Sequence, residues 1–189
     1  MSSTLSLLWL CGLLMALGCA SQKRTETTTP LAARVDERAP SAAALFQRGT
    51  EEAALARYTA AEQTLSEALE GGYPAARVLP LLLDVCSKNA RQSVAVGYAA
   101  PYLQLNPGDF QLRYRVATLL FELGRYDQVR SELSRVLDSA PNHARAHYLL
   151  ALTLRDHFGD DAQAARHFAA YHRLLAQGQR AAPQGSEVL

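Results

Sequence analysis

The sequence predicts an all-α fold, an α-solenoid of about four helix–turn–helix repeats, and two observations carry that prediction. The first is a hydrophobic pattern that returns every 34 residues at several independent phases. Three of these series are Leu69, Leu103 and Leu137; Ala61, Ala95 and Val129; and Leu83, Ala117 and Ala151. The second is that apolar residues within one period recur at helical spacing. Such a period indicates one supersecondary unit stacked on itself, so function is expected in a surface rather than in a catalytic pocket.

Residues 1–18 have the features of an export signal. They contain no charged side chain, and the apolar run over residues 5–17 has about the length of a signal-peptide hydrophobic region. The run ends at Gly18-Cys19, which resembles a bacterial lipobox, where a small residue directly precedes a cysteine. This resemblance implies cleavage after Gly18 and lipidation of the Cys19 thiol. An ordinary secretory signal and an uncleaved membrane anchor are the alternatives.

The segment that follows predicts how the protein is held at its membrane. Residues 19–41 are rich in Ser, Thr, Arg and Pro and nearly devoid of large apolar residues, so we expect a flexible tether. Ala20, rather than Asp, follows Cys19. By resemblance to the enterobacterial sorting rule, this implies the outer membrane. The expected location is therefore the bacterial cell envelope, lipid-anchored and facing the periplasm.

The copy over residues 110–143 shows most clearly how one repeat is built. Apolar residues recur three, four and seven positions apart along its first half, the spacing of one helical face. They are Leu112, Val116, Leu119, Leu120 and Leu123. Gly124 then ends the first helix, and a second apolar stripe follows at Val129, Leu133, Val136 and Leu137. The expected helix N-caps are Asp109, Asn142 and Asp160, and the links between repeats contain Pro107 and Pro141.

This repeat resembles the tetratricopeptide repeat, a 34-residue pair of antiparallel helices. The resemblance is carried by Val116-Ala117, Gly124, Tyr126, Val129, Leu133 and Ala140-Pro141-Asn142. It implies four repeats, 42–75, 76–109, 110–143 and 144–177, the last with a one-residue insertion near His157-Phe158-Gly159. Residues 178–189 are expected to form a disordered tail. An irregular helical bundle is the alternative, but a bundle has no reason to keep a 34-residue step.

The composition argues against several kinds of function. With 19 Lys and Arg against 18 Asp and Glu, the chain lacks the basic surface of a nucleic-acid-binding protein. It has no glycine-rich phosphate loop and no Gly-x-Ser-x-Gly or His-Glu-x-x-His motif, so we expect no enzyme, cofactor or small-molecule substrate. His143 and His147 lack the further ligands that zinc needs, and we expect them on a helix surface with no metal. Cys86 falls on an apolar face and is expected to be a buried free thiol.

The tetratricopeptide resemblance implies where a partner binds. In that family the first helices of the repeats line a concave groove, and positions 2, 5, 9, 12 and 13 of each repeat face it. The groove residues implied here are Arg77, Lys88, Gln111, Tyr114, Phe121, Arg145, Tyr148 and Arg155, with Asp84, Thr118, Glu122 and Leu152 at further such positions. Arg and aromatic residues are enriched at interface hot spots. The alternative for each is packing against a neighbouring helix or solvation.

Together these features predict a membrane-anchored scaffold or assembly factor that binds another envelope protein through its groove or its end face. Small repeat lipoproteins of similar kind serve type IV pilus, secretion or motility machines, and the resemblance implies a role of that sort. The alternative function is an accessory subunit that positions a cell-wall or polysaccharide enzyme.

Overall fold

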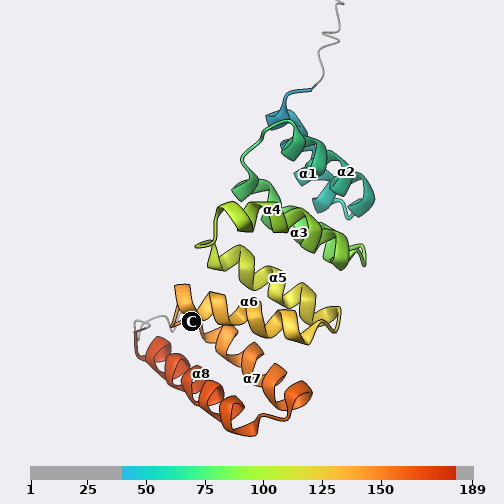
Figure 1. The fold of residues 1–189 in the computed structure, drawn as a ribbon. Coiled ribbons are helices and arrows are strands. Elements are labelled where there is room, and N and C mark those ends of the chain that lie inside the picture. Colours follow the sequence, from blue (N-terminus) through green and yellow to red (C-terminus); the bar gives the residue numbers. More distant parts are fainter. Residues whose placement is uncertain (1–39, 182–189) are drawn as a thin grey trace, which may run out of the picture. The chain divides into compact units, whose positions relative to one another are not determined.

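A computed structural model describes residues 40–181, and this part of the chain contains eight α-helices and no strand (Figure 1). The helices are α1 (Ala42–Ala54), α2 (Tyr58–Glu70), α3 (Ala75–Lys88), α4 (Gln92–Leu105), α5 (Phe110–Glu122), α6 (Tyr126–Ser139), α7 (Ala144–Phe158) and α8 (Asp161–Ala181). The predicted signal peptide, Cys19 and the predicted tether up to residue 39 lie outside the described residues, as do residues 182–189.

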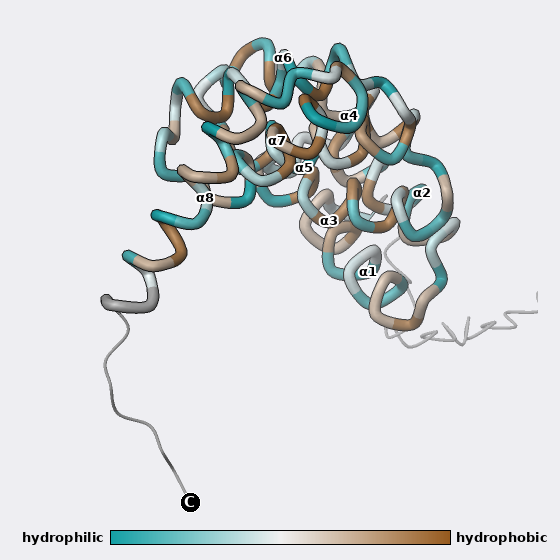
Figure 2. The backbone as a smooth tube through the Cα atoms, turned by 90° about the horizontal axis from the view of Figure 1, so that it is seen from below, coloured by the Kyte–Doolittle hydropathy of each residue, from teal (hydrophilic) through white to brown (hydrophobic). Residues whose placement is uncertain are grey.

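The helices are arranged as four stacked hairpins, which we call repeats 1 to 4. Each helix packs on the helices before and after it in sequence, and the first helices of repeats 1, 2 and 3 also contact one another in order. Figure 2 shows α3, α5 and α7 on the inner side of the curved stack and α2, α4 and α6 on its outer side. The described chain is therefore an all-α solenoid whose inner face is built by the first helix of each repeat.

The 34-residue series of apolar residues forms the core that runs through the stack. Ala61, Ala95 and Val129 are fully buried, and so is Leu133 of the second stripe in repeat 3. The largest fully buried apolar side chains are Leu65, Leu79, Leu82, Leu83 and Leu133. Burial of each such side chain contributes roughly 1.5–3 kcal/mol to the free energy of folding. The repeat spacing thus places the same core positions against each other in successive repeats.

The turn inside each repeat depends on one residue in the left-handed region. Ala56, Ala90, Gly124 and Gly159 have φ of 56°, 55°, 70° and 65°. In repeat 3 the next N–H, that of Arg125, donates to the carbonyl of Leu120, which closes the end of the helix. A Cβ at such a position costs about 1–2 kcal/mol, so Gly124 and Gly159 meet the backbone requirement without strain, whereas Ala56 and Ala90 bear this cost. Gly159 follows Gly124 by 35 residues, as the expected one-residue insertion requires, and α7 has 15 residues where α5 has 13.

The helix ends agree with the sequence at two N-caps and differ at a third. The carboxylates of Asp109 and Asp160 accept hydrogen bonds from the N–H groups of Leu112 (3.0 Å) and Gln163 (2.9 Å), as predicted. Asn142 is not the cap of α7. That helix starts at Ala144, and the ring nitrogen Nδ1 of His143 accepts from the N–H of Ala146 at 3.1 Å. The last helix also differs from expectation, because α8 continues to Ala181, four residues past the predicted end of the repeats at 177.

We expect Ala90→Gly to raise the free energy of unfolding by about 0.5–1.5 kcal/mol, because glycine adopts the left-handed conformation without a Cβ penalty. Urea unfolding monitored by circular dichroism measures the change. Ala100→Gly, at an exposed position inside helix α4, is the control and should lower stability by about 1 kcal/mol. A loss of stability in both variants would contradict the role assigned to the turn.

Gly49→Ala should destabilise the protein by about 1–3 kcal/mol through overpacking. A Cβ at Gly49 would lie 2.7 Å from Cγ of Leu65, a fully buried side chain that cannot move freely. Gly97→Ala is the matched control, since a Cβ there meets no atom within 4 Å and alanine favours the helix. Thermal unfolding of the two variants should shift in opposite directions, and equal shifts would refute the packing argument.

Candidate partner-binding groove

The inner face of the solenoid contains an open pocket between α3 and α5. Its volume is about 240 Å³, and it is lined by Leu83, Asp84, Ser87, Arg115, Thr118, Leu119 and Glu122. Three of these, Asp84, Thr118 and Glu122, stand at the positions expected to face the groove. Arg115 was not predicted, yet its guanidinium donates to the carboxylate of Asp84 across the two helices. Because both side chains are about half exposed, this ion pair contributes at most about 1 kcal/mol, and it gives the pocket a charged wall.

An arginine lies over two aromatic rings at the repeat 1 end of the inner face. Phe46 of α1 and Tyr73 stack with their ring centroids 4.6 Å apart. The guanidinium carbon of Arg77 lies 5.7 Å from the Phe46 centroid and 5.8 Å from the Tyr73 centroid. Arg77 stays exposed, so the predicted groove residue is held in place by cation–π contacts while its donors remain available.

A second cluster of this kind lies in repeat 4. Tyr148 of α7 is 42% exposed, and its ring centroid lies 5.0 Å from that of Tyr171 and 6.0 Å from that of Phe168. The guanidinium carbon of Arg155 lies 5.4 Å from the Phe168 centroid, and Arg155 also donates to Asp156 at 2.6 Å. That hydrogen bond lowers the pKa of the Asp156 carboxyl. Phe168 and Tyr171 belong to α8, the second helix of repeat 4, and the predicted groove contained only residues of first helices, so their part in this cluster was not predicted.

The remaining predicted groove residues divide into two groups. Gln111 and Arg145 are exposed on α5 and α7. Lys88 is exposed as well, and its ammonium lies 5.7 Å from the Tyr58 ring, a cation–π contact like that of Arg77. Tyr114 and Phe121 are half-buried: Tyr114 lies 4.6 Å from the ring of His143, and Phe121 packs edge-on against Tyr126 and His157. For these two the packing alternative applies in part. The exposed Arg77, Lys88, Tyr148 and Arg155 are the stronger candidates for partner contacts.

Outside this surface, the described residues form a larger open pocket of about 550 Å³ between α4, α5 and α6, lined among others by Arg113, Glu132 and Asp138. The described part of the chain contains no group of three or more His, Cys, Asp or Glu side chains placed to hold a metal ion. Cys86 is fully buried, and burial, assisted by the nearby Glu62 carboxylate, raises its pKa to about 12. The thiol is thus protonated and inert at neutral pH, and it is the buried free cysteine that the sequence predicted. None of the described helices combines the length and the apolar character needed to cross a bilayer.

Comparison with known proteins identifies the repeat. Residues 94–152, from α4 to α7, match the family model of the tetratricopeptide repeat. No curated protein sequence matches the chain. Solved structures do: the protein YrrB, described as a TPR protein with an unusual peptide-binding site, matches with a TM-score of 0.61 and 21% identity over 74% of this chain and 75% of that chain.

Two structures of the protein MamA are also similar. One matches with a TM-score of 0.67 and 14% identity over 74% of this chain and 81% of that chain. The other, from Desulfovibrio magneticus RS-1, has a TM-score of 0.64 and 18% identity over 72% and 76% of the two chains. At these identities the likeness establishes the fold. Residues 94–152 therefore carry tetratricopeptide repeat sequence, and the described chain folds as an α-solenoid of tetratricopeptide-type repeats.

Proposed function

We propose that this protein is a membrane-anchored scaffold that binds a segment of another envelope protein along its inner face. The observation that carries the proposal is the arrangement of that face, with an open pocket between α3 and α5 and an arginine–aromatic cluster in repeats 1–2 and in repeat 4. Arg and Tyr are the residue types over-represented among interface hot spots. The peptide-binding site described for YrrB, which shares the fold, supports a peptide as the ligand.

The size and charge of the face favour a protein segment over a small molecule. A pocket of about 240 Å³ is smaller than most drug-sized ligand sites and accommodates a side chain of a partner. Its wall carries both signs of charge, from Asp84, Arg115 and Glu122. The end clusters present cations beside apolar rings, which suit acidic and apolar side chains on the partner. An extended segment or an amphipathic helix reaches all three places.

Lipidation of Cys19 would fix the scaffold at the membrane. The tether that the sequence predicts is short, because a flexible coil of about 20 residues has an average span of only about 25 Å. The repeats would then meet proteins that lie close to the membrane surface. Such a position suits assembly of an outer-membrane machine such as a type IV pilus, a secretion system or a motility apparatus.

We expect the double variant Arg77→Ala/Tyr148→Ala to lose at least about tenfold in partner affinity, because each side chain is an exposed member of an end cluster. The measurement is in-cell crosslinking followed by affinity purification from detergent-solubilised membranes. Leu105→Ala/Arg166→Ala, at exposed positions of α4 and α8, is the matched control and should recover the partner like wild type. Recovery unchanged in the groove variant would place the interface elsewhere.

The identity of the recovered protein separates the two functional classes. A secretin or another component of a pilus, secretion or motility machine supports the assembly role. A cell-wall synthase or hydrolase supports the accessory role instead.

Cys19→Ala should abolish acylation and release the protein from membranes, because the thiol is the attachment point of the lipid. Flotation of cell lysates on a density gradient and incorporation of labelled palmitate measure both effects. Cys86→Ala removes a buried thiol and should leave both readouts unchanged. If Cys19→Ala protein still floats with lipid, the N-terminal segment is an uncleaved anchor.

A further inference from the structure

Three histidines of repeat 4 stand where repeat 3 uses residues of fixed charge. The pairs are Asp109 and His143, Arg113 and His147, and Glu132 and His167, separated by 34, 34 and 35 residues. The longer third step reflects the insertion before Gly159. The correspondence is structural as well, because the three positions make the same contacts in both repeats.

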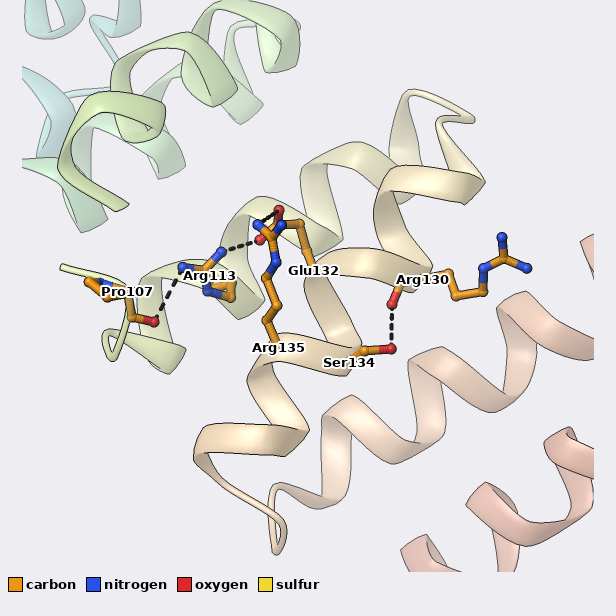
Figure 3. Close-up of polar contacts among 6 residues, drawn as sticks. All are labelled: Pro107, Arg113, Arg130, Glu132, Ser134 and Arg135. Atoms are coloured by element: carbon orange, nitrogen blue, oxygen red, sulfur yellow. Dashed lines mark hydrogen bonds and ion pairs between the residues drawn. The ribbon is translucent and has the colours of Figure 1, made fainter. Parts of the chain in front are cut away.

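In repeat 3 these positions hold the two helices together with permanent charges. Arg113 of α5 is only 5% exposed, and Figure 3 shows it between the carbonyl oxygen of Pro107, to which it donates at 3.2 Å, and the carboxylate of Glu132 on α6. Arg135 donates to the same carboxylate at 3.1 Å. Asp109 caps α5. Carboxylates and guanidinium groups as residue types titrate far from the pH range in which imidazole does.

In repeat 4 imidazoles make the equivalent contacts. Nε2 of His147 lies 2.9 Å from the carbonyl oxygen of Pro141, the counterpart of Pro107. Nδ1 of His147 lies 2.9 Å from Nδ1 of His167 on α8. Nδ1 of His143 caps α7 by accepting the N–H of Ala146. We call these three residues the histidine triplet.

The contacts of the histidine triplet fix where its protons sit. A carbonyl oxygen only accepts, so Nε2 of His147 carries a hydrogen, and Nδ1 of the neutral ring accepts the N–H of His167. One added proton, on Nε2 of His167, leaves that N–H···N bond intact. A second leaves two N–H groups facing each other at 2.9 Å. His143 caps α7 only while its Nδ1 is unprotonated.

The surroundings determine how readily the triplet is protonated. His143 lies against the Tyr114 ring of α5, with Arg145 and His147 on its own helix. His167 shares a pocket of about 250 Å³ with Gln163 of its own helix and with Arg130 and Asp138 of α6. Asp138 and Arg130 thus bring one charge of each sign from α6 into the pocket that His167 lines.

The pKa values give the direction of the effect. Burial lowers the pKa of His143 and of His167 below 6.5, and the neighbouring His147 lowers both further. As the pH falls, these two histidines are protonated in the unfolded chain before they are protonated in the folded protein. The free energy of unfolding is therefore highest above pH 6.5 and decreases as the pH falls below 6.5. It stops decreasing below the pKa values of the two histidines in the folded protein.

We propose that repeat 4 is an acid-sensitive latch: α8 stays docked on α7 while the His147–His167 hydrogen bond and the His143 cap persist, and it detaches once acid removes them, with repeats 1–3 still folded. The position of α8 at the end of the stack allows this, because it packs chiefly on α7. The cluster of Tyr148, Phe168 and Tyr171 spans the two helices and opens with them. If the groove function proposed above is right, acid releases the partner from this end.

Hydrogen exchange of the full chain at pH 7.5 and pH 5.0, corrected for intrinsic exchange rates, tests the latch without a partner. Protection of α8 should fall at least about tenfold at pH 5.0, while α5 and α6 keep theirs. The swap variant His143→Asp/His147→Arg/His167→Glu copies repeat 3 and should keep α8 protected at both pH values. His172→Arg, at an exposed histidine of α8, should behave like wild type.

Two results would overturn the latch: equal protection of α8 in wild type at both pH values, or the same acid loss in the swap variant. If the swap variant fails to fold at pH 7.5, His167→Gln replaces it, since an amide N–H can donate to His147 without titrating. The loss of protection should then move to lower pH, and an unmoved midpoint would contradict the proposal.

This test is independent of the groove. Hydrogen exchange of α8 is measured without a ligand. An exchange result that contradicts the latch therefore does not count against partner binding by the inner face at pH 7.5. If α8 opens in acid but the partner stays bound, the latch is supported, and the cluster of Tyr148, Phe168 and Tyr171 is not part of the partner interface.

Discussion

The fold depends on the return of each second helix antiparallel to the first within a short turn. A single left-handed residue makes that return possible, at Ala56, Ala90, Gly124 and Gly159. With the hairpin closed, the apolar stripes of both helices point to one side, and the next hairpin covers them. The core and the inner face therefore both follow from one backbone conformation repeated along the chain.

The 34-residue period was enough to predict the fold class, because repetition leaves few other ways to bury the same stripe. The insertion before Gly159 was also visible, since the glycine of the turn is displaced by one position. The N-cap of α7 was predicted wrongly. Imidazole is an uncommon cap, and the polar Asn142 just before His143 fits the usual pattern better.

The inner face was harder to predict than the core. From their positions within the repeat, Asp84 and Thr118 were predicted to face the groove, and both line the pocket on the inner face. Position within the repeat does not predict which side chains contact each other between repeats. Arg115 pairs with Asp84 over 31 residues of sequence, and Phe168 reaches Tyr148 from another helix. Such contacts depend on side-chain length and on the angle between repeats. Neither quantity appears in a pattern of apolar residues.

Stacking of repeats has a consequence for how tightly a partner is held. Each repeat contacts only its neighbours, so the clusters at Arg77 and at Arg155 are rigidly spaced yet energetically separate. A segment that engages both binds as a bivalent ligand, whose second contact forms at a high effective concentration set by the scaffold. Each contact alone can then be weak and quickly reversed while the whole complex persists. In the proposed binding mode, a shorter segment that reaches one cluster would gain none of this avidity, so the solenoid would select its partners by length as well as by chemistry.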